Sequence, residues 1–313
     1  PHDPRARSGL RKLLGAAALL ALSAHTAHAA TWLECEGNKI KWNNGWTNMY
    51  LSTTSFPAGG AWDADLQNAM WHWNNVKGSG FNFFVGRDTD GTHAKDNGVN
   101  EMYLHSTEAG SALAVTFTRY HCYWLFGYQY GIDETDIVFN NSRSWSTAQL
   151  NYANLGSPFN VELVGLHELG HAAGLKHSDG VQATMNSFYA NGGPLGNSKE
   201  VDPLPDDRAG LRALYADGTT ERDVAGSALK RTGSGTSGLI SSPASAARGS
   251  TVNVGFTFGN QGTSSQTFNI GFYLSTNNII STGDLLLGTN TGASASAGAI
   301  GSFTRSLTIP SNV

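Results

Sequence analysis

Three of the ten histidines of this 313-residue chain fall within eleven positions of one segment, residues 164–179, which reads VGLHELGHAAGLKHSD. Residues four apart lie on one face of a helix, so His167 and His171 can bind the same metal ion. Gly174 can adopt the left-handed backbone that ends a helix in a sharp turn, which would bring in His177 as a third ligand. Three neutral imidazoles with one position left for water are a ligand set of catalytic zinc.

Glu168 directly follows the first of these ligands. A carboxylate beside a water that zinc has acidified can accept its proton and pass it to a leaving amine. The segment therefore holds the groups needed to hydrolyse an amide bond. The alternative interpretation is an accidental histidine cluster. We expect H-E-x-x-H by chance in about one chain in a hundred, and the fixed offsets of Gly174 and His177 lower that several hundred-fold.

The periodicity of apolar residues predicts the elements around this segment. Spacings of three and four predict helices, the second with Asn160 as its N-cap, over residues 61–76, 160–175 and 205–216. Alternation predicts strands at residues 38–44, 48–56, 81–86, 100–106, 113–124 and 134–140, the first two as a pair. This order indicates an α+β catalytic domain over residues 30–217.

The composition changes after this domain. Residues 218–237 lack apolar periodicity and are rich in Gly, Ser and Thr, so we predict a flexible linker. Residues 238–313 contain short alternating stretches separated by turn residues, a pattern typical of a β-sandwich. A seven-stranded sandwich normally needs about 100 residues. We therefore expect this all-β module to be truncated.

The N-terminus has the features of an export signal. Arg5, Arg7, Arg11 and Lys12 precede the apolar run LLGAAALLALSA, and small residues follow at the cleavage spacing at Ala27 and Ala29. Residues 1–29 are predicted to be a signal peptide, and the protein to be secreted and extracellular. The run is too short to span a bilayer in the mature protein, although a membrane anchor is the alternative interpretation.

Two further properties bear on the partners and the redox state. The net charge is −4 with no long basic run, so the sequence lacks the electrostatic pattern of a nucleic-acid-binding protein. Cys35 and Cys122 are the only cysteines. In an oxidising compartment they are expected to form a disulfide, with two free buried thiols as the alternative.

The residues H-E-L-G-H-A-A-G-L-K-H resemble the H-E-x-x-H-x-x-G-x-x-H signature of the metzincin zinc endopeptidases. Within that clan the chain is similar to the matrixins, because Ser178 follows the third histidine and Met185 supplies a Met-turn candidate. The strand over 134–140 and the helix beginning at 205 also resemble their matrixin counterparts. The resemblance covers most of residues 38–217.

This resemblance implies a twisted mixed sheet with an active-site helix and a catalytic Zn²⁺. It implies that His167, His171 and His177 are the metal ligands, that Glu168 is the catalytic residue and that Met185 forms an apolar floor beneath the ligands. The chain departs from the matrixins where Asn186 and Ser187 replace the usual Tyr-Pro, which predicts a different wall for the specificity pocket over residues 186–196.

A polar loop offers candidates for a second ion. Carboxylates suit Ca²⁺, and imidazoles suit a second Zn²⁺. The candidate residues are Asp88, Asp90, His93, Asp96, His105 and His121. Their spacing fits no known ion-binding loop, so a solvated acidic loop is the favoured interpretation.

The sequence thus predicts a secreted zinc metalloendopeptidase acting on protein or peptide substrates. The alternative is a secreted adhesin or binding protein whose zinc domain is catalytically inactive, but such proteins usually lose the glutamate first, and Glu168 is present. Residues 238–313 resemble CARDB-type adhesion domains. This resemblance implies an accessory module that binds a surface, a polysaccharide or a protein, with a simple stalk as the alternative.

Overall fold

The computed structural model describes residues 30–89, 93, 95–148, 157–179, 183–187, 201–226, 231–232, 235–236, 240–241, 245–277 and 280–313. The predicted signal peptide (1–29), Asp90, residues 188–196 of the predicted pocket and parts of the predicted linker lie outside the described residues. None of the helices in the described ranges is long and apolar enough to cross a membrane.

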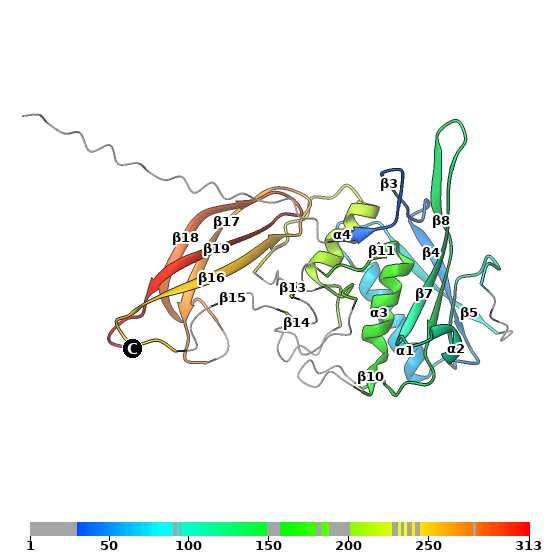
Figure 1. The fold of residues 1–313 in the computed structure, drawn as a ribbon, viewed down its shortest axis with the longest axis horizontal. Coiled ribbons are helices and arrows are strands. Elements are labelled where there is room, and N and C mark those ends of the chain that lie inside the picture. Colours follow the sequence, from blue (N-terminus) through cyan, green and yellow to red (C-terminus); the bar gives the residue numbers. More distant parts are fainter. Residues whose placement is uncertain are drawn as a thin grey trace, which may run out of the picture.

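A five-stranded mixed sheet forms the frame of the N-terminal part (Figure 1). Its strands, in spatial order, are β5 (Asn82–Asp88), β4 (Trp46–Ser52), β6 (Glu101–Leu104), β8 (Tyr128–Phe139) and β7 (Ala114–Trp124). The first four are parallel, and β7 pairs antiparallel with β8 at the edge. The predicted α+β class with a mixed sheet is confirmed.

One predicted pairing is wrong. Residues 38–44 were expected to pair with 48–56, but β3 (Asn38–Lys39) pairs with β2 (Glu34–Cys35), while β4 is flanked by β5 and β6. Alternation identifies a half-buried strand without identifying its neighbour. The parallel partners of β4 come from segments that are distant in sequence.

Helices α1 (Ala61–Asn74) and α3 (Val161–Ala172) pack against each other and cover one face of the sheet. They cross closely at Gly165, where an added Cβ would lie 2.9 Å from Leu66 Cδ2. The buried side chains between the helices and the sheet include Leu66, Met70, Trp73, Met102, Ile137, Phe139, Leu166 and Leu169. The other helices are the short α2 (Ser106–Ala109) and α4 (Pro205–Tyr215).

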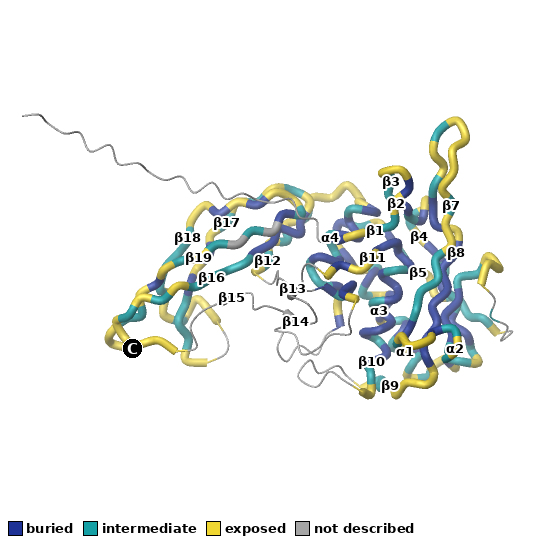
Figure 2. Tube along the Cα trace, viewed as in Figure 1, coloured by how far each residue is buried: buried dark blue, intermediate teal, exposed yellow. Residues whose placement is uncertain are grey.

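Short strand pairs complete the N-terminal part. β1 (Thr31–Trp32) pairs with β11 (Leu175–Lys176), and β9 (Trp145–Ser146) pairs with β10 (Phe159–Asn160). The β7–β8 hairpin extends well beyond the sheet (Figure 1), and its tip is exposed, with Phe126 at 95% (Figure 2).

The C-terminal part is built from strands. β12 (Val224–Ala225), β15 (Ile240–Ser241), β16 (Thr251–Asn260) and β19 (Ile300–Thr308) form one sheet, and β17 (Gln266–Leu274) pairs with β18 (Leu285–Ala295). β13 (Arg231–Thr232) pairs with β14 (Gly235–Thr236). An apolar cluster draws on both larger sheets and includes Phe258, Phe272 and Leu307.

The start of the predicted linker contacts both parts of the chain. Asp223 Oδ2 accepts a hydrogen bond from Arg212 Nη1 at 3.2 Å, and the Asp223 carbonyl accepts one from the Gln261 amide at 2.7 Å. Arg212 Nη1 also donates to the Gln261 carbonyl. Residues 223–225 are therefore held at the junction of α4 with the C-terminal strands.

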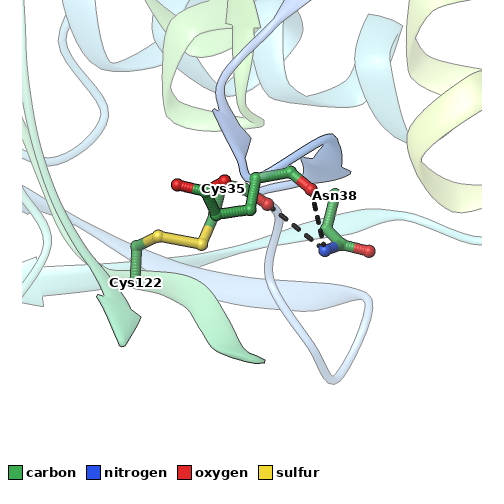
Figure 3. Close-up of a disulfide and its surroundings, with 4 residues drawn as sticks. Cys35, Asn38 and Cys122 are labelled. Atoms are coloured by element: carbon green, nitrogen blue, oxygen red, sulfur yellow. Dashed lines mark hydrogen bonds between the residues drawn. A yellow bond between two sulfur atoms is a disulfide. The ribbon is translucent and has the colours of Figure 1, made fainter. Parts of the chain in front are cut away.

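The predicted disulfide is confirmed, because Cys35 and Cys122 are bonded with a Cα–Cα distance of 5.8 Å (Figure 3). It connects β2 to the projecting end of β7. Asn38 Nδ2 donates to the Cys35 carbonyl at 3.2 Å and holds the β2–β3 turn beside the bond.

Replacing both cysteines with serine should lower the free energy of unfolding by about 4–5 kcal/mol, since the bond closes a loop of 87 residues in the unfolded chain. Urea denaturation of the double variant measures this loss. The reduced wild-type protein should show the same loss. A loss below ~1 kcal/mol in both would contradict the loop-closure argument.

Candidate metal centre

Helix α3 brings His167 and His171 onto one face. The helix starts at Asn160, whose side chain accepts a hydrogen bond from the Leu163 amide at 2.8 Å, as the predicted N-cap should. At the other end, Trp42 Nε1 and the Tyr215 hydroxyl donate to the carbonyls of Ala172 and Ala173, each at 2.8 Å. These bonds satisfy carbonyls that lack a partner within the helix and fix where it ends.

Gly174 turns the chain back towards the helix, as the sequence predicts. Its φ of +100° belongs to the region that favours glycine, and an added Cβ would lie 3.0 Å from the Ile40 carbonyl oxygen. The chain then forms β11 and reaches His177, whose carbonyl accepts a hydrogen bond from Thr31 Oγ1 at 2.7 Å.

The three imidazoles converge through their Nε2 atoms. His177 Nε2 lies 3.3 Å from His167 Nε2 and 3.2 Å from His171 Nε2. Nitrogens bound tetrahedrally to zinc at 2.0–2.1 Å would be about 3.3–3.4 Å apart. The observed separations therefore match those of a tetrahedral zinc site.

Hydrogen bonds at the far side of two rings fix their tautomers. His167 Nδ1 lies 2.7 Å from the Thr184 carbonyl oxygen, and His171 Nδ1 lies 2.8 Å from the Leu175 carbonyl oxygen. Because a carbonyl can only accept, each Nδ1 carries the proton and each Nε2 carries a lone pair. Burial lowers the pKa of both His167 and His171 to about 4, so both rings are neutral near pH 7 and ready to bind a metal.

Glu168 points its carboxylate into the same region from within the core. It is only 5% exposed, and burial raises the pKa of its carboxyl, an effect opposed by His171 and by a hydrogen bond from Thr116. Thr116 Oγ1 lies 2.7 Å from Glu168 Oε2. Thr116 belongs to β7, so the edge strand of the sheet orients the carboxylate.

Met185 is buried and packs against α3. A Cβ added at Gly170 of α3 would meet the Met185 sulfur, so the glycine lets the thioether approach the helix closely. Its carbonyl accepts a hydrogen bond from the Ser178 amide at 2.8 Å. The turn that carries Met185 is thus tied directly to the residue after His177.

Two buried carboxylates of α4 hold this turn, and the sequence did not single them out. Asp207 accepts hydrogen bonds from the amides of Thr184 (2.6 Å) and Met185 (3.0 Å). Asp206 accepts one from Ser178 Oγ at 2.8 Å, and burial together with Asp207 raises the pKa of Asp206 to about 7. Since the Thr184 carbonyl contacts His167, Asp207 helps to orient the imidazole of His167.

Of the residues considered for a second ion, those that the structure describes do not all come together. His121 Nδ1 pairs with Asp133 at 2.8 Å, His105 caps α2, and Asp96 lies on the surface near Arg119. The structure instead brings Asp88 and His93 together with Glu101, a residue that the sequence did not single out.

Comparison with known proteins relates this region to the matrixins. Residues 121–216, which include the three histidines, Glu168 and Met185, match the family model described as Matrixin, Peptidase_M10. The chain is 34% identical over 80 residues to matrix metalloproteinase-25 of Homo sapiens and 34% identical over 82 residues to stromelysin-3 of Mus musculus. These alignments cover 26% of this chain but only 13% and 14% of the relatives, so the chain spans a small part of their length.

A solved structure also aligns with the chain. High choriolytic enzyme 1, a hatching enzyme zinc-protease from Oryzias latipes (medaka fish), aligns with a TM-score of 0.29 and 14% identity over 59% of this chain and 98% of that chain. The matrixin match, together with the two relatives, supports a metzincin-like domain around the metal centre.

Proposed function

We propose that this chain is a secreted zinc-dependent metalloendopeptidase, in which His167, His171 and His177 hold the metal and Glu168 is the general base. The observation that carries the proposal is the convergence of three Nε2 atoms at tetrahedral spacing beside a buried carboxylate. The matrixin match over residues 121–216 supports the same activity.

The donor set fits zinc. The neutral rings of His167 and His171 direct their Nε2 lone pairs towards His177 Nε2, which lies little more than 3 Å away. A cation bound between the three nitrogens would stabilise this arrangement. When bound, zinc would supply Lewis-acid polarisation of a substrate carbonyl and would acidify a water molecule.

Glu168 is suited to accept and return a proton. Its raised pKa brings the carboxyl towards neutral pH, where a general base works best. Thr116 holds one carboxylate oxygen, and because Thr116 and Glu168 lie on different elements, the position of this oxygen depends on the packing of β7 against α3.

The edge of the sheet offers a place for an extended substrate. β7 is the terminal strand, and across the described ranges no strand pairs with its outer edge. A peptide could pair with this edge through main-chain hydrogen bonds, and it would then run past α3 and the metal centre. We propose that protein or peptide substrates bind in this way.

The decisive experiment incubates the purified full chain and zinc with casein or gelatin, with and without a chelator. We expect cleavage that the chelator stops and added zinc restores. Absence of cleavage by a protein that retains its zinc would instead favour the adhesin or binding protein with an inactive zinc domain.

Replacing Thr116 with Val should move the acidic limb of the kcat/KM profile to higher pH. The hydrogen bond from Thr116 lowers the pKa of Glu168, so its loss raises that pKa, and the base is then protonated at higher pH. Peptidase assays across pH measure the shift, with Thr118→Val on the same strand as the control. An unchanged limb would show that Thr116 does not tune Glu168.

The remaining parts of the proposal concern organisation and location. Residues 1–29 act as a signal peptide, residues 30–217 form the catalytic domain, residues 218–237 link it to the C-terminal part, and residues 238–313 form a CARDB-like β-sandwich that binds a surface, a polysaccharide or a protein. Detection of a chain beginning at Ala30 in the culture medium would support secretion.

A further inference from the structure

A second group of side chains that could hold a metal ion is formed by Asp88 at the end of β5, Glu101 at the start of β6, and His93 in the loop between these strands. Their ligand atoms all lie within 4.8 Å of one another. We propose that these three residues bind a divalent cation of the zinc type, at a site distinct from the one formed by His167, His171 and His177. This inference does not depend on the proposed peptidase activity.

The two carboxylates come from the two strands that flank β4. Asp88 is the last residue of β5 and Glu101 the first residue of β6, and both strands pair with β4. Their side chains are only 9% and 4% exposed. Placing two carboxylates together away from water is costly unless positive charge accompanies them, and a bound cation would supply it.

His93 is fixed so that one ring nitrogen faces both carboxylates. Its ring stacks on Tyr103 with centroids 4.2 Å apart and an interplanar angle of 10°. Nδ1 lies 3.6 Å from Asp88 Oδ2 and 3.8 Å from Glu101 Oε1, and it is buried without a hydrogen bond among the described residues. These distances are too long for hydrogen bonds but leave room for an ion between the three atoms.

The other ring nitrogen sets the tautomer that a metal ligand needs. His93 Nε2 lies 3.3 Å from Ser52 Oγ, and Ser52 Oγ lies 2.8 Å from Thr54 Oγ1. If Ser52 donates to Thr54, it can accept from Nε2–H, which leaves the lone pair on Nδ1. A hydroxyl behind a histidine ligand is the kind of supporting contact that metal sites use to fix the ring.

One imidazole and two carboxylates define the class of ion. Zinc ligands at 2.0–2.2 Å in tetrahedral array lie about 3.3–3.6 Å apart, so a small inward movement of the side chains completes the coordination, with water at the open position. Calcium takes six to eight oxygen ligands, and a nitrogen donor disfavours it. The site therefore selects zinc or a similar transition ion over calcium.

The proposed site lies on the opposite face of the sheet from α3. Side chains alternate between faces along a strand. Arg87 bonds to Asp63 of α1, and Met102 packs in the core under the helices, so their neighbours Asp88 and Glu101 point to the other face. Tyr103 belongs to a separate apolar cluster with Ala109 and Val138. The two sets of ligands share no residue, so each can be removed alone.

Metal analysis of the full-length wild-type chain and five variants tests the proposal. After zinc loading and removal of free zinc, the wild-type chain should hold two ions, His93→Gln one, His171→Ala one and the double variant none. Asp96→Asn, in the same loop but with an exposed carboxylate, should keep both ions. Glu101→Gln, which preserves size, provides a second removal should His93→Gln misfold, and circular dichroism verifies the fold of each.

Stability provides a readout independent of activity. In the His171→Ala protein, zinc at roughly 100-fold above Kd should raise Tm by about 5 °C or more, and His93→Gln should abolish the rise. Calcium should give a smaller shift.

Several outcomes would overturn the second site. The wild-type chain could hold only one zinc ion, or His93→Gln could hold as many zinc ions as the wild type. Calcium could also bind to the His93→Gln protein as well as it binds to the wild type. The first two would indicate a plain ion pair between His93 and the carboxylates. Each leaves the proposed peptidase intact, whereas an ion count that His171→Ala leaves unchanged would contradict the catalytic centre instead.

Discussion

A Glu168→Gln protein should keep its zinc content and lose at least ~10²–10⁴-fold in turnover, the share that general-base catalysis typically supplies. Glutamine has the size of glutamate and can still accept the hydrogen bond from Thr116 Oγ1, but it cannot take up a proton. The expected loss corresponds to about 3–5 kcal/mol of transition-state stabilisation. Peptidase assays and metal analysis on the same preparation measure both quantities.

The matched control for this variant lies on the same helix. Glu162 stands in the first turn of α3, and its carboxylate pairs with His72 at 3.2 Å, away from the three imidazoles. Glu162→Gln should keep turnover within a few-fold of the wild type. Near-normal peptidase activity of Glu168→Gln would refute the assigned mechanism while leaving the metal site untouched.

Replacing His171 with Ala should remove one ion per chain and abolish peptidase activity. Two imidazoles bind zinc far more weakly than three, because each nitrogen contributes directly to the coordination energy. The variant also leaves the Leu175 carbonyl without its bond from His171 Nδ1, which loosens the turn towards His177. We therefore expect a lower Tm than for Glu168→Gln, since metal binding is linked to folding.

A histidine outside the centre separates ligand loss from a general effect of losing an imidazole. His121 lies on β7 and pairs with Asp133, so His121→Ala should retain the full metal content. The two inactive variants must differ in metal content, with Glu168→Gln fully loaded and His171→Ala lacking one ion. Chelator-resistant cleavage by the wild-type protein would refute a zinc peptidase of any kind.

The parts of the metal centre that could be predicted are those that depend on neighbouring residues. Two histidines on one helix face, an N-cap at Asn160 and a turn at Gly174 follow from helical geometry and from the freedom of glycine. The disulfide followed from a count of two cysteines in a chain with export features. Each of these predictions needed only local spacing or the number of candidates.

The groups that orient the centre were not predictable in this way. Thr116 contacts Glu168 from 52 residues away, and Asp207 contacts Thr184 from 23 residues away. A threonine in an edge strand and an aspartate in the first turn of a helix both have ordinary explanations within their own elements. Their second role arises only because β7 packs against α3 and the first turn of α4 meets the turn that carries Met185.

The sequence by itself therefore determined which residues are candidates for metal ligands and general base, and where the chain turns. It could do so because backbone geometry places near neighbours in fixed directions. Only the tertiary structure decided which distant side chains meet them, as the pairing of β4 with β5 and β6 shows. That pairing brings Glu101 beside Asp88 and His93, whereas spacing alone had grouped those two with residues that lie elsewhere. The physical reason is that strand order depends on the burial of whole faces summed over the domain, a quantity that no local pattern encodes.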